Sequence, residues 1–81
     1  MSTKNNQIFI AKLSPKVREK DLEQNFSKYG KINNILLKVG YAFIEYDSFK
    51  DAEEAVGKMD GKTMEGQKIV VEHASKLKPN I

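Results

Sequence analysis

The chain has 81 residues, which is enough for one domain with a single modest core. It has a net charge of +3 and no cysteine, so disulfide scaffolds and thiolate metal sites are excluded. No segment approaches the roughly 18 consecutive apolar residues of a membrane span, and the polar first residues do not resemble a signal peptide. The mild basicity permits a polyanionic partner without requiring one.

Residues 1–6 are polar and are expected to be disordered. A strand is predicted over residues 7–13, where apolar and mixed residues alternate. Ser14 and Pro15 end this strand.

A helix is predicted next, because Leu22, Phe26 and Tyr29 recur at the spacing of one helical face. Gly30 suits the end of that helix. Its start is poorly marked, because Arg18 stands where a capping Ser or Thr would be expected.

Two further strands are predicted over residues 32–38 and 41–46, and the two residues between them indicate an antiparallel hairpin. Asp47 and Ser48 offer a cap for a second helix. Its buried stripe is expected to comprise Ala52, Ala55, Val56 and Met59. A fourth strand is predicted over residues 67–73, and residues 76–81 are expected to form a tail or linker.

The predicted order is therefore βαββαβ. Such a chain forms an α+β two-layer sandwich of the ferredoxin-like type, with two helices on one face of a four-stranded antiparallel sheet. The opposite face of the sheet must then meet solvent or a ligand.

Side chains alternate along a strand, so the buried set predicts the exposed set. If alternate residues such as Ile8 and Ile44 point into the core, their neighbours point outward. The open face is then expected to carry Phe9, Leu36, Lys38, Tyr41, Phe43 and Glu45. Leu36 is either a tolerated apolar residue or a contact for a base or sugar.

Three aromatic rings on an exposed sheet indicate a flat ligand. Nucleobases are flat, and each base stacked on an aromatic ring contributes roughly 1–3 kcal/mol. A strand register shifted by one residue would instead bury Phe9, Tyr41 and Phe43, but it would expose Ile8, Ile44 and the other aliphatic residues.

Two segments resemble the signatures of the RNA recognition motif family: residues 8–13 its six-residue signature and residues 39–46 its eight-residue signature. The resemblance covers residues 7–75 and implies the fold described above. It also implies that Phe9, Tyr41 and Phe43 stack on the bases of single-stranded RNA.

Residues 17–22, 37–41 and 69–74 are similar to the N-terminal RNA recognition motif of serine/arginine-rich (SR) splicing factors. That resemblance implies a nuclear protein that binds pre-mRNA and other splicing factors, although no Arg-Ser tail is present in this sequence. A monomer is expected.

The first position of the eight-residue signature is usually Lys or Arg, but here it is Val39. Lys38 is the nearest substitute, and Lys12 and Lys68 are further candidates beside the sheet. We therefore expect a modest contribution from phosphate contacts.

Base edges are expected to meet groups near the end of the fourth strand, at Glu72, His73 and Ala74. Glu45 and Glu72 would disfavour phosphate, but each can accept a hydrogen bond from an exocyclic amine.

The alternative function is a protein-interaction domain of the same fold that uses its helical face. An enzyme is not expected, because no nucleophile is paired with His73, the single histidine, in a recognisable motif. The lack of cysteine and of a second histidine also argues against a zinc site, and no cofactor is expected.

Overall fold

The computed structural model describes residues 6–74; the expected tail over residues 76–81 and most of the expected disordered N-terminus lie outside this range. In chain order the elements are β1 (Gln7–Ala11), α1 (Glu19–Phe26), the 3-10 turn η1 (Ser27–Tyr29), β2 (Ile32–Lys38), β3 (Tyr41–Tyr46), α2 (Phe49–Met59), β4 (Thr63–Met64), β5 (Gln67–Lys68) and β6 (Val70–His73).

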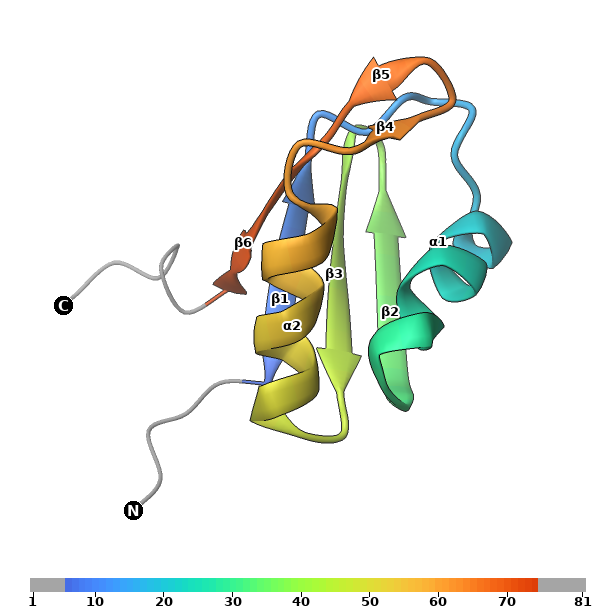
Figure 1. Cartoon of the computed structure of the whole chain (residues 1–81). Helices are drawn as coiled ribbons and strands as arrows, with labels where there is room; N and C mark the ends of the chain where they lie inside the picture. Colours follow the sequence, from blue (N-terminus) through green and yellow to red (C-terminus); the bar gives the residue numbers. More distant parts are fainter. Residues whose placement is uncertain (1–5, 75–81) are drawn as a thin grey trace, which may run out of the picture.

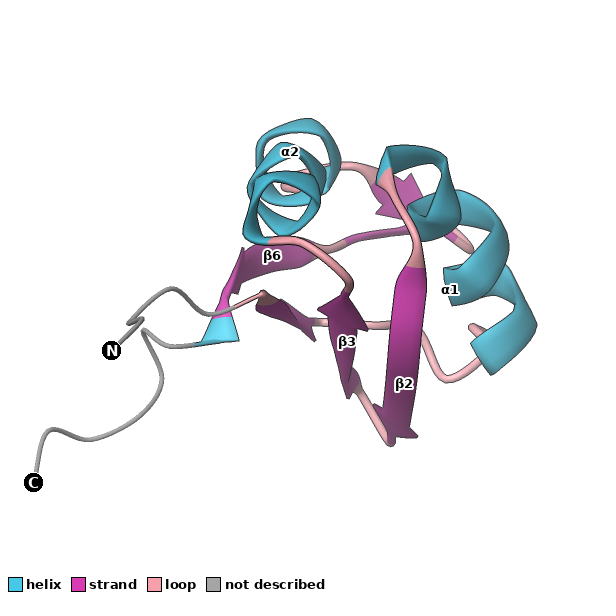
Figure 2. Cartoon of the chain, turned by 90° about the horizontal axis from the view of Figure 1, so that it is seen from below, coloured by secondary structure: helices cyan, strands magenta, loops and turns pink. Residues whose placement is uncertain are grey.

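The main sheet has four antiparallel strands in the order β2-β3-β1-β6 (Figure 1). Both helices lie on one side of this sheet, and within the described residues no helix covers the other side (Figure 2). The α+β two-layer sandwich predicted from the sequence is therefore confirmed.

The core lies between the sheet and the helices and is built from the aliphatic and aromatic residues that alternation predicts. Its members in the main sheet and the two helices are Ile8, Ile10, Leu22, Phe26, Ala42, Ile44, Tyr46, Ala52, Ala55, Met59 and Val71. Val56 is only partly buried at the margin of this core. The register pairs Ile8 with Ile44 and Ile10 with Ala42, so one face of the sheet is buried as a unit.

Tyr46 joins the sheet to α1 and to the N-terminal end of β1. Its buried hydroxyl donates a 2.6 Å hydrogen bond to the carbonyl of Phe26, in the last turn of α1. Its backbone N–H donates to the carbonyl of Asn6 at 2.8 Å, and the Asn6 side chain donates back to the Tyr46 carbonyl. Asn6 is therefore held to the end of β3 by two hydrogen bonds.

Helix α1 has an N-terminal capping bond that the sequence analysis did not predict. The backbone N–H of Arg18 donates to the carboxylate of Asp21, three residues into the helix, at 3.0 Å. This carboxylate satisfies the N–H of the capping residue itself, which is the second of the two bonds of a capping box, and it also lies near the positive end of the helix dipole. The final turn that contains Tyr29 is 3-10 rather than α.

Gly30 follows this turn and approaches α2 closely. A Cβ atom at this position would lie 2.2 Å from Cγ of Asp51. Glycine is therefore required here by the packing of the turn against the start of α2.

The predicted fourth strand is interrupted, which is a correction to the sequence analysis. Gln67 and Lys68 pair with β4 in a separate two-stranded hairpin, and only residues 70–73 join the main sheet. The hairpin turn contains Glu65 and Gly66, both with positive φ. Met64 is the single buried residue of β4 and β5, so this segment lacks the alternation that reveals a strand.

Replacement of Tyr46 by Phe tests the link between the sheet and α1. The change leaves a buried carbonyl without its donor, so we expect Tyr46→Phe to lower the free energy of unfolding by about 1–2 kcal/mol in urea denaturation. Tyr29→Phe is the control, because the Tyr29 hydroxyl donates its hydrogen bond to the weakly accepting sulfur of Met59, at 3.4 Å. Equal losses in the two variants would contradict the assignment.

The same tyrosine makes stability depend on alkaline pH. Burial, reinforced by the charges of Tyr29 and Asp51, raises the pKa of Tyr46 well above its ordinary value of 10.0. The unfolded chain therefore releases this proton first, and stability falls as the pH rises above 10. Between pH 9 and 11, the wild type should lose stability more steeply than Tyr46→Phe.

Candidate nucleic-acid interface

The uncovered face of the sheet carries three rows of side chains that run across the strands. The strand registers align Leu36, Phe43, Phe9 and Glu72 in a central row. A second row contains Lys38, Tyr41, Ala11 and Val70, and a third contains Asn34, Glu45 and Gln7. We call this surface the open face.

The three aromatic rings of the open face contact one another. The ring centroid of Phe9 lies 5.1 Å from that of Phe43 and 5.9 Å from that of Tyr41, and the Tyr41 and Phe43 centroids are 6.1 Å apart. These are favourable distances for tilted and edge-to-face aromatic pairs. The rings, which sequence parity places on the same face, thus form one connected cluster.

The cluster is accessible from solvent. Tyr41 is 39% exposed and the neighbouring Leu36 is 47% exposed. Phe9 and Phe43 are half-buried because their neighbours flank them on the pleated surface. An apolar patch of this kind can stack on flat rings or pack against sugars.

The charges of the three rows are mixed. Lys38 lies at the β2 end of the second row, Glu45 lies in the middle of the third row, and Glu72 lies at the β6 end of the central row. A carboxylate accepts hydrogen bonds and repels phosphate, whereas the ammonium of Lys38 attracts it. The face is therefore suited to contacts with bases over most of its area, with one cation at its edge.

The β2–β3 turn carries no cation at its tip. Val39 there is 91% exposed, and Gly40 has the positive φ of +86° that favours glycine. The Gly40 carbonyl accepts a 3.0 Å hydrogen bond from the N–H of Leu13, which ties the turn to the loop after β1.

Two of the predicted lysines lie outside the three rows. Lys12 follows β1 with a positive φ of +60°, and its carbonyl accepts a 2.8 Å hydrogen bond from the Gln67 side chain. Lys68 belongs to β5 and pairs with Thr63. Both lysines are exposed, and both lie in segments that adjoin the sheet rather than within its open face.

The side chains of His73 and Ala74 do not lie on the open face. His73 pairs with the core residue Ile8, so its ring points to the helical side, where it stacks on Phe49 with centroids 5.3 Å apart and planes 16° apart. Its Nδ1 is buried without a hydrogen-bond partner in the described part of the chain. Ala74 is buried. The residue of this trio on the open face is Glu72.

The structure adds two polar residues that the sequence analysis did not single out. Asn34 and Gln7 occupy the third row on either side of Glu45. The parity that selected Leu36 and Phe9 already placed them on this face, but their side chains carry no aromatic or charged signal. They supply amide donors and acceptors beside the aromatic cluster.

Within residues 6–74 no cluster of three or more His, Asp or Glu side chains is arranged to hold a metal ion. None of the helices described in this range is long and apolar enough to cross a membrane.

Comparison with known proteins points to the same family as the geometry. Residues 8–70 match the model of the RNA recognition motif. The chain is 44% identical over 68 residues to serine/arginine-rich splicing factor 4 of Homo sapiens and 43% identical over 68 residues to serine/arginine-rich splicing factor 5 of Mus musculus. Each alignment covers 84% of this chain, but only 14% and 25%, respectively, of the relative.

A solved structure with the same architecture is that of the Caenorhabditis elegans NONO-1 homodimer. It superposes with a TM-score of 0.81 and 28% identity, over 90% of this chain and 32% of that one. The resemblance to SR splicing factors that the sequence suggested is confirmed by the relatives. The chain belongs to the RNA recognition motif family.

Proposed function

We propose that the chain binds single-stranded RNA on its open face, as the RNA-binding domain of a nuclear pre-mRNA splicing factor. The observation that carries this proposal is the connected cluster of Phe9, Tyr41 and Phe43 on a sheet face that no described helix covers. The splicing role rests on the relatives, which are splicing factors by name.

The domain acts as a binding module rather than an enzyme. Bases stack on the aromatic cluster, and sugars pack against its edges and against Leu36. Lys38 attracts a phosphate at one margin of the face. Glu45 and Glu72 accept hydrogen bonds from exocyclic amines of the bases.

The domain acts as a monomer on RNA, and its affinity is completed by neighbouring domains of a longer protein. The chain spans a quarter or less of the length of the two mammalian splicing factors described above. Contacts with other splicing proteins would then come from those further segments or from the helical face.

Removal of two rings tests the stacking surface. Because each stacked base contributes roughly 1–3 kcal/mol, the variant Tyr41→Ala/Phe43→Ala should lose at least about 2 kcal/mol of binding free energy. Fluorescence anisotropy against a short degenerate single-stranded RNA pool measures this, and circular dichroism verifies that the variant is folded. Glu53→Ala/Glu54→Ala on the exposed side of α2 is the control. Equal binding by a folded double variant would move the function to the helical face.

A cation introduced at the tip of the β2–β3 turn tests how much phosphate contacts contribute to RNA binding. The wild type should show a shallow salt dependence, with a slope of log K against log salt smaller in magnitude than the ~3.5 expected for five counterions released from a single strand. Val39→Lys places a charge at a 91% exposed position, so it should tighten binding at low salt and steepen the slope by about 0.7.

Val39→Thr is the uncharged control for that change and should leave the slope where it is. A wild-type slope equivalent to five or more counterions would show that phosphate contacts dominate after all.

Glu72 offers a test of base preference. A carboxylate cannot donate to the carbonyl oxygens of uracil, whereas it accepts from the amino group of cytosine. We expect the wild type to bind oligocytidine more tightly than oligouridine, and Glu72→Gln to narrow that difference, since an amide can both donate and accept. The paired titrations are run with Glu53→Gln as the control. An unchanged ratio would remove Glu72 from the base-reading contacts.

A further inference from the structure

Strand β2 forms one edge of the main sheet, and it pairs within the described residues only with β3. The outer side of such a strand presents backbone N–H and C=O groups to solvent. Proteins commonly protect an edge with bulges or charges, and β2 has a register irregularity between Ile32 and Asn34 and a lysine at its end, Lys38. The stretch between them, Asn34–Leu37, has neither.

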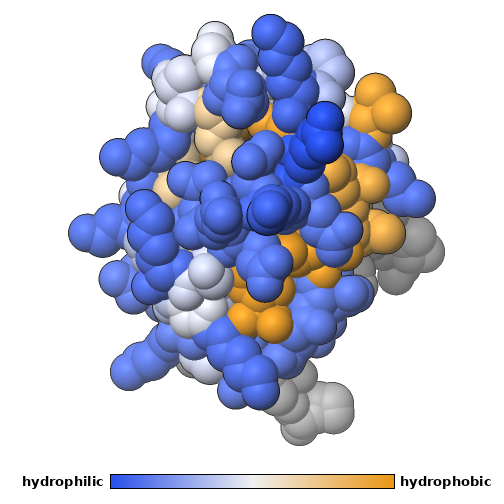
Figure 3. All heavy atoms as spheres, turned by 90° about the vertical axis from the view of Figure 1, so that its right-hand side faces the viewer, coloured by the Kyte–Doolittle hydropathy of each residue, from blue (hydrophilic) through white to orange (hydrophobic). Residues whose placement is uncertain are grey.

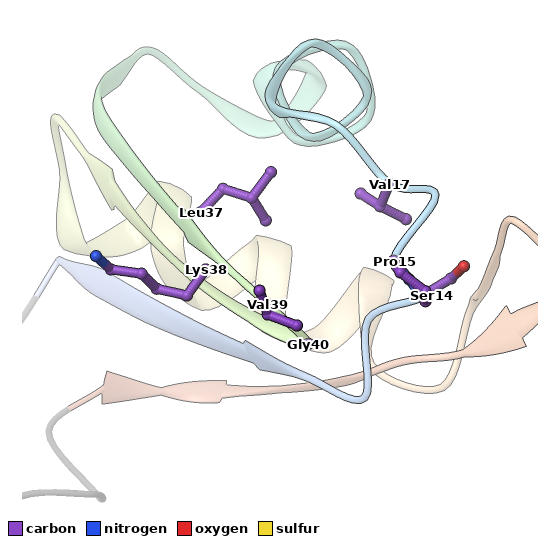
Figure 4. A pocket seen from close by; sticks show the side chains of 7 residues that line it. All are labelled: Ser14, Pro15, Val17, Leu37, Lys38, Val39 and Gly40. Carbon is purple, nitrogen blue, oxygen red and sulfur yellow. The ribbon is translucent and has the colours of Figure 1, made fainter.

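Two hollows lie beside this edge, one along each half of the strand. The larger, of about 420 Å³, lies between the β2–β3 turn and the loop after β1 and is lined mainly by apolar groups: Ser14, Pro15, Val17, Leu37, Lys38, Val39 and Gly40 (Figure 4). We call it the apolar hollow. Leu37 and Val17 point toward one another across it, and Val39 stands at its rim.

The smaller hollow, of about 230 Å³, is lined by Glu19, Glu23 and residues 32–35. The two glutamates are four residues apart in α1 and therefore lie on the same side of the helix. We call this the acidic hollow. The surface on this side of the molecule shows an apolar band flanked by hydrophilic residues (Figure 3).

The charge and shape of this edge select the class of occupant. Two carboxylates beside β2 repel phosphates, so a nucleic acid that lies on the open face is not expected to continue over the acidic hollow. The same carboxylates attract Lys or Arg, and the apolar hollow fits an aliphatic side chain. The exposed backbone of an edge strand is matched by the backbone of an extended peptide.

We propose that the β2 edge binds an extended, basic segment of another protein, which adds to the sheet as a fifth strand. In the antiparallel arrangement the segment runs opposite to β2, so its aliphatic residue enters the apolar hollow first and its basic residues follow. Ile35 lines one hollow and Leu37 the other, two positions apart along the same face of β2. The recognised pattern is therefore an aliphatic residue with Arg or Lys two and four positions later.

The test uses the 81-residue chain and a synthetic, end-capped peptide, Thr-Leu-Thr-Arg-Thr-Arg-Thr. Titration followed by NMR of the ¹⁵N-labelled protein should shift the amides of residues 32–38 and of the hollows in a saturable way. Shifts centred on Phe9, Tyr41 and Phe43, or none at millimolar peptide, would overturn the proposal.

Three controls separate strand addition from charge attraction alone. Replacing both arginines of the peptide by Glu should abolish binding. Two further peptides are N-methylated on alternate sets of residues. Methylation of the residues whose N–H groups pair with β2 should abolish binding, whereas methylation of the other set should leave binding unchanged. Equal binding by both methylated peptides would contradict a fifth strand.

The protein side has a matched pair of variants with the same change in net charge. Glu19→Gln/Glu23→Gln should lower the affinity for the peptide about three- to tenfold, the range expected for exposed ion pairs. Glu53→Gln/Glu54→Gln on α2 should not weaken it. Similar effects in the two variants would overturn the assignment of the acidic hollow.

Two further measurements distinguish peptide binding at this edge from binding at the open face and from self-association of the chain. Tyr41→Ala/Phe43→Ala should bind the peptide like the wild type, whatever becomes of RNA binding. Sedimentation of the free chain should show a monomer. A dimer that the peptide dissociates would mean that the occupant of the edge is a second copy, and the proposal would be wrong.

Discussion

The register between β1 and β3 is the constraint on which the rest of the molecule depends. Because Ile8 pairs with Ile44 and Phe9 with Phe43, the aliphatic residues of both strands fall on one side and the aromatic residues on the other. A shift of one residue would exchange the two sets and leave the helices facing rings. Core packing and the binding surface are thus determined by the same pairing, and the hydrogen bonds of Tyr46 to Asn6 and Phe26 secure one end of it.

Alternation within strands was sufficient to predict most of the candidate site. It placed Phe9, Tyr41 and Phe43 on one face of the sheet, because a two-residue period is a strong signal when the other face is aliphatic. The hairpin of β4 and β5 was not predicted, since its residues carry no such period. His73 has the parity of the core residue Val71, so the same alternation is consistent with its ring lying on the helical side, where it stacks on Phe49.

Val39 stands at a signature position that is usually Lys or Arg. This difference changes which contacts would hold RNA on the open face. Without a cation at the turn, attraction to the backbone comes from Lys38 and from lysines in the adjoining segments, while the glutamates of the open face oppose it. Affinity would then come mainly from stacking and from base edges. Under the proposed function, such a surface would discriminate between single-stranded and duplex nucleic acid, because only unpaired bases offer their flat faces.

Strand β2 contributes to three different surfaces of the molecule. Leu36 and Lys38 face the open sheet, Ile35 and Leu37 face the helices, and the backbone between them faces outward at the edge. A strand added at that edge would place its own side chains beside Leu36, within the surface that we propose meets RNA. Occupancy of one site would then alter affinity at the other, and thermodynamic linkage requires the two effects to be equal. If both proposed sites are occupied as described, the edge of this small sheet would couple the binding of a protein partner to the binding of RNA.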